Sequence, residues 1–265
     1  MIRLSAHIGY LYADVPLADR LAAAARDGFT AVEHPGPYEI PAAEMRRRLD
    51  DLGLGFSQIT SGMGREGEKG LACLKGREAE FRAGFDRALD YAQAIGCPYL
   101  HPMAGVVTGG WLDAGEVYRA NLGWALEHCE GTGVRLLVEA ITIPGYYMGT
   151  LRAAAELQDA FARRFDLLFD SYHAAVLGED PAAWVAANAD RIGHVHIADH
   201  PGRHEPGTGR IDFSALLSAL AGAGYGGAIG FEYIPGIPMA ESARFLSRWK
   251  RLLPGASSLS TGVTE

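Results

Sequence analysis

The residues of this chain best suited to chemistry are three acids and one histidine within short apolar segments. Glu139 stands in LLVEAI, Asp170 in LLFDSYH, His196 in HVHIAD and Glu232 in AIGFEYIP. Carboxylate oxygens with one imidazole suit a divalent ion such as Mg²⁺, Mn²⁺ or Co²⁺ better than a metal that prefers thiolates. Because burying several carboxylates without a compensating cation is costly, the four residues together favour a metal site.

The alternation of apolar and polar residues places these side chains on one face of each segment. In HVHIAD, Val195 and Ile197 alternate with His194 and His196. Residues of equal parity point to the same side of a β-strand, so both histidines point into whatever the strand encloses, and the three acids have the same inward parity. Taken alone, His194 is more typical of a hydrogen-bonded core residue than of a ligand. Taken alone, Asp170 is as typical of a loop cap as of a metal ligand.

Short apolar runs alternate with longer helical patterns along nearly the whole chain, which is typical of βα units and a parallel sheet. The predicted strands are residues 3–9, 30–35, 56–61, 99–105, 136–141, 167–173, 193–199 and 228–235. Helical patterns such as 16–28 and 76–96 lie between them and end in glycine, as a C-cap does. Eight strands, each followed by a helix, predict an α/β fold of the (β/α)8 TIM-barrel type. An open doubly wound sheet is less favoured, because no GxGxxG motif follows the first strand.

Length and composition limit the class of protein. The chain has 265 residues and a formal net charge of −8 at pH 7, which argues against a nucleic-acid partner. Its cysteines, Cys73, Cys97 and Cys129, have no CxxC spacing, which disfavours a disulfide framework. With no leader pattern and no apolar run that could span a membrane, we expect a cytoplasmic protein that acts on a small molecule. We expect residues 1–253 to form one barrel and the polar residues 254–265 a flexible tail.

Several segments resemble those of a known protein family. The run HVHIADHPGRHEPGTGRIDF (194–213) and the later IGFEYIP (229–235) resemble the C-terminal segments of the hydroxypyruvate isomerase family, within the xylose isomerase-like barrels. GEKGLACLKGREAEFR (67–82) and HPMAGVV (101–107) resemble earlier segments of that family in order and spacing. The resemblance implies a metal-dependent aldose–ketose isomerase of a small hydroxy-oxo acid. Its substrate would be hydroxypyruvate, converted to tartronate semialdehyde, or a related 2-oxo-tetronate. It also makes a homodimer plausible.

The resemblance further implies roles for particular residues. It implies metal ligation by Glu139, Asp170, His196 and Glu232, and substrate binding by His173, Arg203 and His101. Glu139 and Glu232 also match the acid/base pair, which moves a proton between neighbouring carbons through an enediolate. The guanidinium of Arg203 suits the carboxylate end of the substrate. For His101, a packed structural role is as good an interpretation as substrate binding.

This chain departs from the family pattern at several positions. Close relatives often have glutamine at the His196 position, whereas sugar epimerases of the superfamily have histidine. Relatives usually have a basic residue at the position of Ile234, and EAITIPGYY (139–147) lacks their asparagine-containing loop. A ketose 3-epimerase with the same metal and glutamates is therefore an alternative. A non-catalytic sugar-binding barrel is another, and the intact Glu139 and Glu232 argue against it.

A DNA-repair endonuclease of the same barrel type is a further alternative. Such an enzyme needs a multi-zinc site with several more ligands and a basic surface that faces DNA. The acidic composition of the chain argues against this class.

Overall fold

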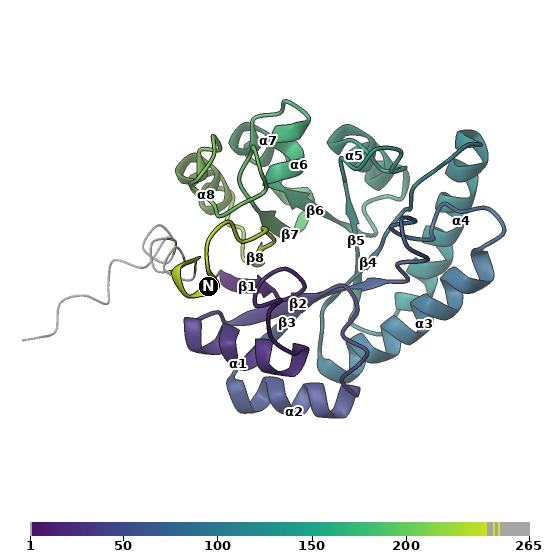
Figure 1. Cartoon of the computed structure of the whole chain (residues 1–265). Coiled ribbons are helices and arrows are strands. Elements are labelled where there is room, and N and C mark those ends of the chain that lie inside the picture. Colours follow the sequence, from purple (N-terminus) through teal and green to yellow (C-terminus); the bar gives the residue numbers. More distant parts are fainter. Residues whose placement is uncertain (1, 243–245, 247–248, 250–265) are drawn as a thin grey trace, which may run out of the picture.

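The computed structural model of the chain describes residues 2–242, 246 and 249. Its strands are β1 (Arg3–His7), β2 (Ala31–His34), β3 (Gly55–Ser61), β4 (Tyr99–Pro102), β5 (Arg135–Glu139), β6 (Asp166–Asp170), β7 (Ile192–Ile197) and β8 (Ala228–Phe231). They are parallel and form a closed barrel in the order of the sequence, with helices around it (Figure 1). The pairing of β1 with β8 closes the barrel. The predicted (β/α)8 barrel is confirmed. The predicted tail, 254–265, lies outside the described residues.

Helices connect the strands on the outside of the barrel. They are α1 (Leu17–Asp27), α2 (Ala42–Leu52), α3 (Glu78–Ile95), α4 (Trp111–Cys129), α5 (Leu151–Ala160), α6 (Ser171–Val176), α7 (Pro181–Asn188), the short 3₁₀ helix η1 (Ala189–Arg191) and α8 (Phe213–Gly222). Gly28 ends α1 and Gly96 ends α3 in the left-handed conformation, at φ 92° and 71°, as their patterns predict. Among the described residues, no helix is long and apolar enough to cross a lipid bilayer.

The expectation of one helix after each strand is wrong at β6. Both α6 and α7 follow this strand. The Asp180 side chain accepts N–H groups at the start of α7, and Pro181 occupies the first turn. Both features favour a new helix start, so the segment divides into two short helices.

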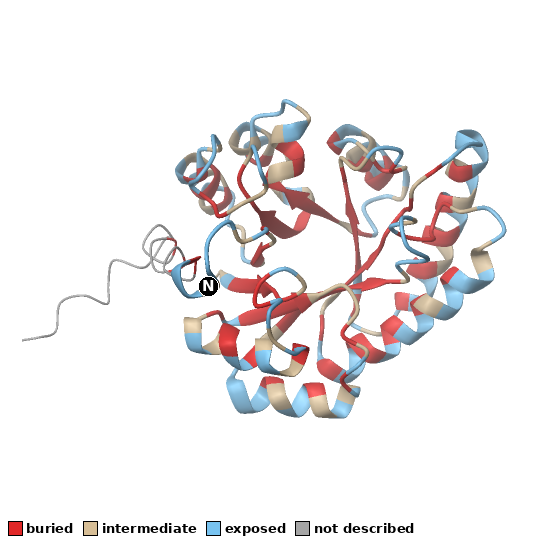
Figure 2. Cartoon of the chain, in the orientation of Figure 1, coloured by how far each residue is buried: buried red, intermediate tan, exposed pale blue. Residues whose placement is uncertain are grey.

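The barrel wall separates an apolar outer layer from a polar interior. Phe169 of β6 faces outward and stacks on Trp184 of α7, with ring centroids 5.0 Å apart. Val195 and Ile197 of β7 belong to the same apolar core, as their parity predicts. Buried residues follow the strands and the inner helix faces, while the outer helix faces are exposed (Figure 2). The side chains of opposite parity on each strand therefore point into the barrel interior.

Some strands end earlier than predicted. β4 ends at Pro102 and β8 at Phe231, where the sequence pattern extended to residues 105 and 235. The chain leaves the barrel at these points to form the loops above its carboxyl end. Glu232 is thus the first residue after β8, but its N–H still donates to Ile197 O at 3.2 Å, which continues the strand pairing by one residue.

Candidate active site

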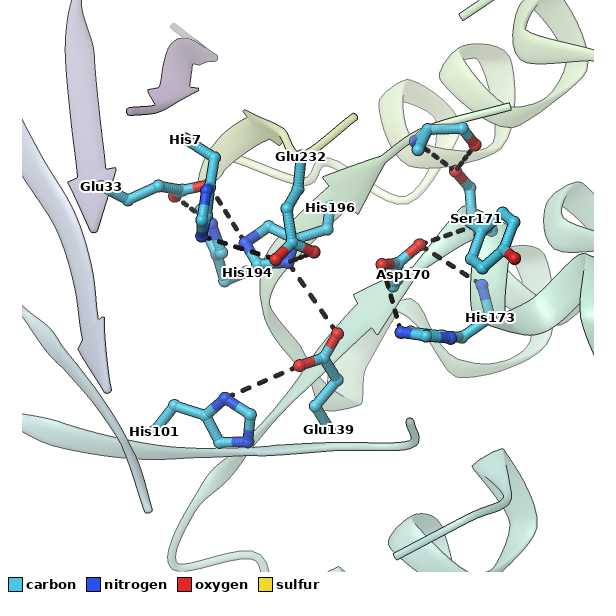
Figure 3. A network of polar contacts seen from close by, with 12 residues as sticks. His7, Glu33, His101, Glu139, Asp170, Ser171, His173, His194, His196 and Glu232 are labelled. Atoms are coloured by element: carbon cyan, nitrogen blue, oxygen red, sulfur yellow. Dashed lines mark hydrogen bonds and ion pairs between the residues drawn. The ribbon is translucent and has the colours of Figure 1, made fainter. Parts of the chain in front are cut away.

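The four predicted metal ligands meet at the carboxyl end of the barrel. Glu139 is the last residue of β5, Asp170 is the last of β6, His196 lies near the end of β7, and Glu232 follows β8 directly. One donor atom from each side chain lies within 4.8 Å of those of the other three (Figure 3). We call these four residues the acidic cluster. Neighbouring strands present them side by side because parallel strands end at the same face of the barrel.

The donor atoms of the acidic cluster fit a divalent metal ion. Glu139 Oε1 and His196 Nδ1 are buried and have no hydrogen-bond partner among the described residues. His196 Nδ1 nevertheless lies 3.1 Å from Glu232 Oε2 and 3.9 Å from Glu139 Oε1, so these atoms converge on one region. Buried polar atoms without partners are costly, and a hard cation is the partner that this set of oxygens and one imidazole prefers.

Arg203 supplies a positive charge beside the acids. Its Nη2 lies 2.6 Å from Glu232 Oε2 and 3.3 Å from Asp170 Oδ2. The other oxygen of Asp170 accepts the Tyr172 N–H at 2.7 Å and caps α6. The capping interpretation of Asp170 is therefore confirmed, and capping by one oxygen leaves the other directed toward Arg203 and the acidic cluster.

The two glutamates have different electrostatic surroundings. Burial raises the pKa of Glu139, and the nearby Glu232 carboxylate raises it further. Burial acts in the same direction on Glu232, but the Arg203 guanidinium and the His196 imidazole outweigh it and hold the pKa of Glu232 well below its ordinary value. Two carboxylates with separated pKa values can serve as proton donor and acceptor in one site.

The predicted substrate-binding residues line one cavity of about 290 Å³ with the acidic cluster. These residues are His101, His173 and Arg203. His101 Nδ1 lies 3.6 Å from Glu139 Oε2, and burial lowers the pKa of His101 to about 3, so its ring is neutral near pH 7. The Nδ1 atom of His173 lies 2.7 Å from Thr142 Oγ1, which fixes the ring at the cavity wall. Both imidazoles can therefore form hydrogen bonds with a small polar ligand.

Arg203 belongs to a loop built around a buried aspartate. The Asp199 carboxylate is fully buried and accepts four backbone N–H groups at 2.7 to 3.1 Å, from His200, Gly207, Gly209 and Ile211. The Arg203 N–H donates to the backbone oxygen of Asp199 at 3.0 Å. The guanidinium lies 5.6 Å from the ring centre of Tyr10 and 5.3 Å from that of Tyr172. The loop therefore fixes the backbone of Arg203, while the two aromatic rings flank its guanidinium.

Replacing Asp199 with alanine is expected to lower the free energy of unfolding by about 2–4 kcal/mol, because several loop amides lose a charged acceptor. Urea denaturation measures this change. Asp212→Ala is the matched control, since Asp212 accepts a single amide, Ala215 N, at 2.9 Å, and its loss should cost only about 1 kcal/mol. Equal losses in the two variants would contradict the organising role of Asp199.

The structure also brings to the cavity residues that sequence reasoning missed. His7 Nε2 lies 3.4 Å from Glu232 Oε1, and Tyr10, Gln58 and Lys69 line the same cavity. The parity of His7 in RLSAHIG is a signal that could have identified it. Lys69 carries no such signal, because the path of its loop decides where its side chain lies. His194 instead hydrogen-bonds to the buried Glu33, which confirms its interpretation as a core residue.

The chain matches one protein family and several curated relatives along most of its length. The model of the xylose isomerase-like TIM barrel family matches residues 21–249. The 2-oxo-tetronate isomerase of Cupriavidus necator is 38% identical over 246 residues, which cover 89% of this chain and 94% of that protein. The hydroxypyruvate isomerase of Escherichia coli is 30% identical over 259 residues, which cover 94% of this chain and all of that protein.

A solved structure agrees in fold along nearly its full length. The crystal structure described as an AP endonuclease, family 2, from Brucella melitensis is 31% identical and superimposes with a TM-score of 0.89, covering 94% of this chain and 99% of the other. An L-ribulose 3-epimerase, at 22% identity and a TM-score of 0.80, shares the fold. On this evidence, the chain belongs to the xylose isomerase-like TIM barrel family.

Proposed function

We propose that the protein is a metal-dependent aldose–ketose isomerase of a small hydroxy-oxo acid, with hydroxypyruvate or a 2-oxo-tetronate as substrate. One observation carries this proposal: Glu139 and Glu232 face the same cavity and have pKa values displaced in opposite directions. Isomerisation of this kind needs a group that takes a proton from one carbon and a group that returns a proton to its neighbour. The names of the curated relatives support the same class of reaction.

Glu139, Asp170, His196 and Glu232 are the residues that would hold the metal, Mg²⁺ or Mn²⁺ and alternatively Co²⁺. When bound, such an ion acts as a Lewis acid for the oxygens on the two reacting carbons. The chain moves the protons. Glu232, kept ionised by Arg203 and His196, accepts the proton from the hydroxyl-bearing carbon, and this gives the enediolate. Glu139, with the higher pKa, holds a proton near the adjacent carbon and donates it there, while the hydroxyl proton passes to the former carbonyl oxygen, which leaves the aldehyde and a new hydroxyl group.

Two cations in the cavity suit an acidic substrate. The Arg203 guanidinium already forms ion pairs with Glu232 and Asp170, whereas Lys69 is exposed and lines the cavity. Ile234, at the position where the family resemblance implies a basic residue, is 46% exposed. Lys69 would therefore supply the positive charge that Ile234 cannot. A cavity of about 290 Å³ suits a substrate of three or four carbons rather than a large ligand.

Replacing Lys69 with methionine is expected to raise KM for the acid about tenfold, because a hydrogen bond to a charged group contributes roughly 1.5 kcal/mol or more. The kcat should change little, since Lys69 takes no part in the proton transfers assigned to Glu139 and Glu232. Steady-state kinetics on the acid and on a neutral ketose of similar length measure the effect. Lys75→Met is the control, because Lys75 is exposed and pairs with Asp113. An unchanged KM would exclude Lys69 from recognition of the carboxylate.

A substrate panel tests the function as a whole. Protein loaded with Mn²⁺ or Mg²⁺ is incubated in heavy water with hydroxypyruvate, 2-oxo-tetronates and free ketoses, and followed by nuclear magnetic resonance. Conversion of an acid with deuterium incorporated at the new carbon–hydrogen bond is the expected result. Inversion of a free ketose at C3 would instead establish the epimerase alternative. Metal binding without exchange in any compound would support a non-catalytic barrel.

A further inference from the structure

A network of buried polar side chains lies next to the acidic cluster, away from the cavity. Its centre is Glu33 of β2, which is fully buried and does not line the cavity. Glu33 Oε2 accepts hydrogen bonds from His194 Nε2 at 2.7 Å and from Ser5 Oγ at 3.2 Å. Ser57 Oγ donates to Ser5 Oγ at 2.8 Å. Glu33 takes no part in the proton transfers assigned to Glu139 and Glu232, although burying a carboxylate there is costly.

His196 connects this network to the acidic cluster. Its Nε2 lies 3.1 Å from Glu33 Oε1, while its Nδ1 lies 3.1 Å from Glu232 Oε2 on the other side of the ring (Figure 3). The two nitrogens thus face different carboxylates. Nδ1 is directed to the side where Glu232 and Glu139 lie, so it is the nitrogen that can join them as a ligand.

The tautomer of His196 follows from what Glu33 can accept. An ionised carboxylate has no proton to donate, so a ring nitrogen that faces one is favoured to carry the N–H. Both nitrogens face a carboxylate, but Glu232 Oε2 already accepts from Arg203 Nη2 at 2.6 Å, whereas Glu33 Oε1 has no hydrogen-bond partner among the described residues, so the N–H is favoured on Nε2. The neutral ring then has its lone pair on Nδ1, and a metal ligand needs this lone pair. Since His194 and Ser5 both engage Oε2, Oε1 remains for His196.

The barrel makes room for this contact at Gly230 of β8. A Cβ atom added at Gly230 would collide with Glu33 Oε1 and lie 2.7 Å from His196 Cδ2. Any side chain at this inward position would therefore separate the carboxylate from the imidazole. The close approach of Glu33 to His196 thus depends on a residue without a side chain.

We propose that Glu33 is a positioning residue that fixes the tautomer of His196, so that Nδ1 is the nitrogen that binds the metal. The inference rests on the metal site of the proposed function, but not on the identity of the substrate. Its readouts are metal affinity and the protonation pattern of one ring. A protein that binds metal with the expected tautomer and isomerises nothing would retain this inference and refute the proposed function.

Glu33→Gln is the informative variant. The amide oxygen can still accept from His194, which turns the NH₂ group toward His196 Nε2 and favours the proton on Nδ1. The affinity for Mn²⁺, measured by the electron paramagnetic resonance signal of the free ion, is expected to fall 10- to 100-fold, the usual range for loss of a carboxylate that orients a histidine ligand. An affinity within threefold of wild type would overturn the proposal.

A control separates positioning from general destabilisation. Gln158 is buried on α5 and donates to Phe165 O at 2.9 Å, outside the barrel interior. Gln158→Leu should lower the melting temperature and leave the Mn²⁺ affinity within threefold of wild type. If Gln158→Leu weakened Mn²⁺ binding as much as Glu33→Gln, the effect of Glu33 would be a consequence of lost stability, and the proposal would fail.

The wild-type protein offers a test that does not depend on any variant folding. Nuclear magnetic resonance of ¹⁵N-histidine-labelled protein, loaded with diamagnetic Zn²⁺, distinguishes protonated from metal-bound ring nitrogens. A proton on Nε2 of His196 and metal at Nδ1 are expected. Metal at Nε2, or failure of the protein to bind Mn²⁺ or Zn²⁺ at all, would refute the role assigned to Glu33.

Discussion

Glu232→Gln is expected to lower kcat by about 10³- to 10⁴-fold, the upper range for loss of a general base. Glutamine preserves the shape of the side chain and one oxygen donor, but the amide cannot accept a proton from carbon. The ion pair with Arg203 at 2.6 Å is lost as well, which weakens the placement of that guanidinium. The rate of deuterium exchange into substrate, measured in heavy water at saturating Mn²⁺, reports the step directly.

The matched control for this variant is Glu205→Gln. Glu205 is buried in the loop that carries Arg203, and it accepts the Gly236 N–H at 3.2 Å without lining the cavity. The same chemical change at this position should lower kcat by less than about threefold, because no proton-transfer group is altered. Deuterium exchange at the wild-type rate in Glu232→Gln would show that another group takes the proton, and His7, whose Nε2 lies 3.4 Å from Glu232 Oε1, is a candidate outside the acidic cluster.

The second large effect on turnover is expected when the metal is removed. Chelation is expected to abolish turnover, and Mn²⁺ to restore it. Affinity for the metal should also rise with pH. Burial disfavours a charged His196, but the carboxylates of Glu232 and Glu33 raise its pKa well above the ordinary value. The imidazole is therefore protonated in the metal-free protein and must lose a proton before it can act as a ligand.

The sign of this dependence follows from the proton released. Below the metal-free pKa of His196, each unit of pH should strengthen binding by about tenfold, so the apparent Kd should fall about 100-fold between roughly pH 5 and pH 7. Mn²⁺ titrations across this interval measure the slope. Calorimetry in two buffers with different ionisation enthalpies counts the protons released. Affinity that does not change with pH would mean that His196 is neutral before the metal binds.

The sequence alone determined the fold and the composition of the acidic cluster. Apolar runs with turn residues between them define eight strands, and parity assigns Glu139, Asp170 and His196 to the barrel interior. Both signals are local, because the direction of a side chain on a strand depends only on its place in the alternation. The closed barrel then brings inward residues at the ends of neighbouring strands together.

The partners of these residues were decided by the tertiary structure. Glu33 and His194 are 161 positions apart in the chain, and they meet only because β1 pairs with β8 and the barrel closes. No spacing pattern encodes a contact across the interior. The positions of the Arg203 and Lys69 side chains depend on the paths of their loops. In the loop of Arg203, that path is set by the Asp199 carboxylate and its four backbone donors. Strand alternation thus fixes which side chains enter the barrel, while barrel closure and loop geometry fix which of them touch.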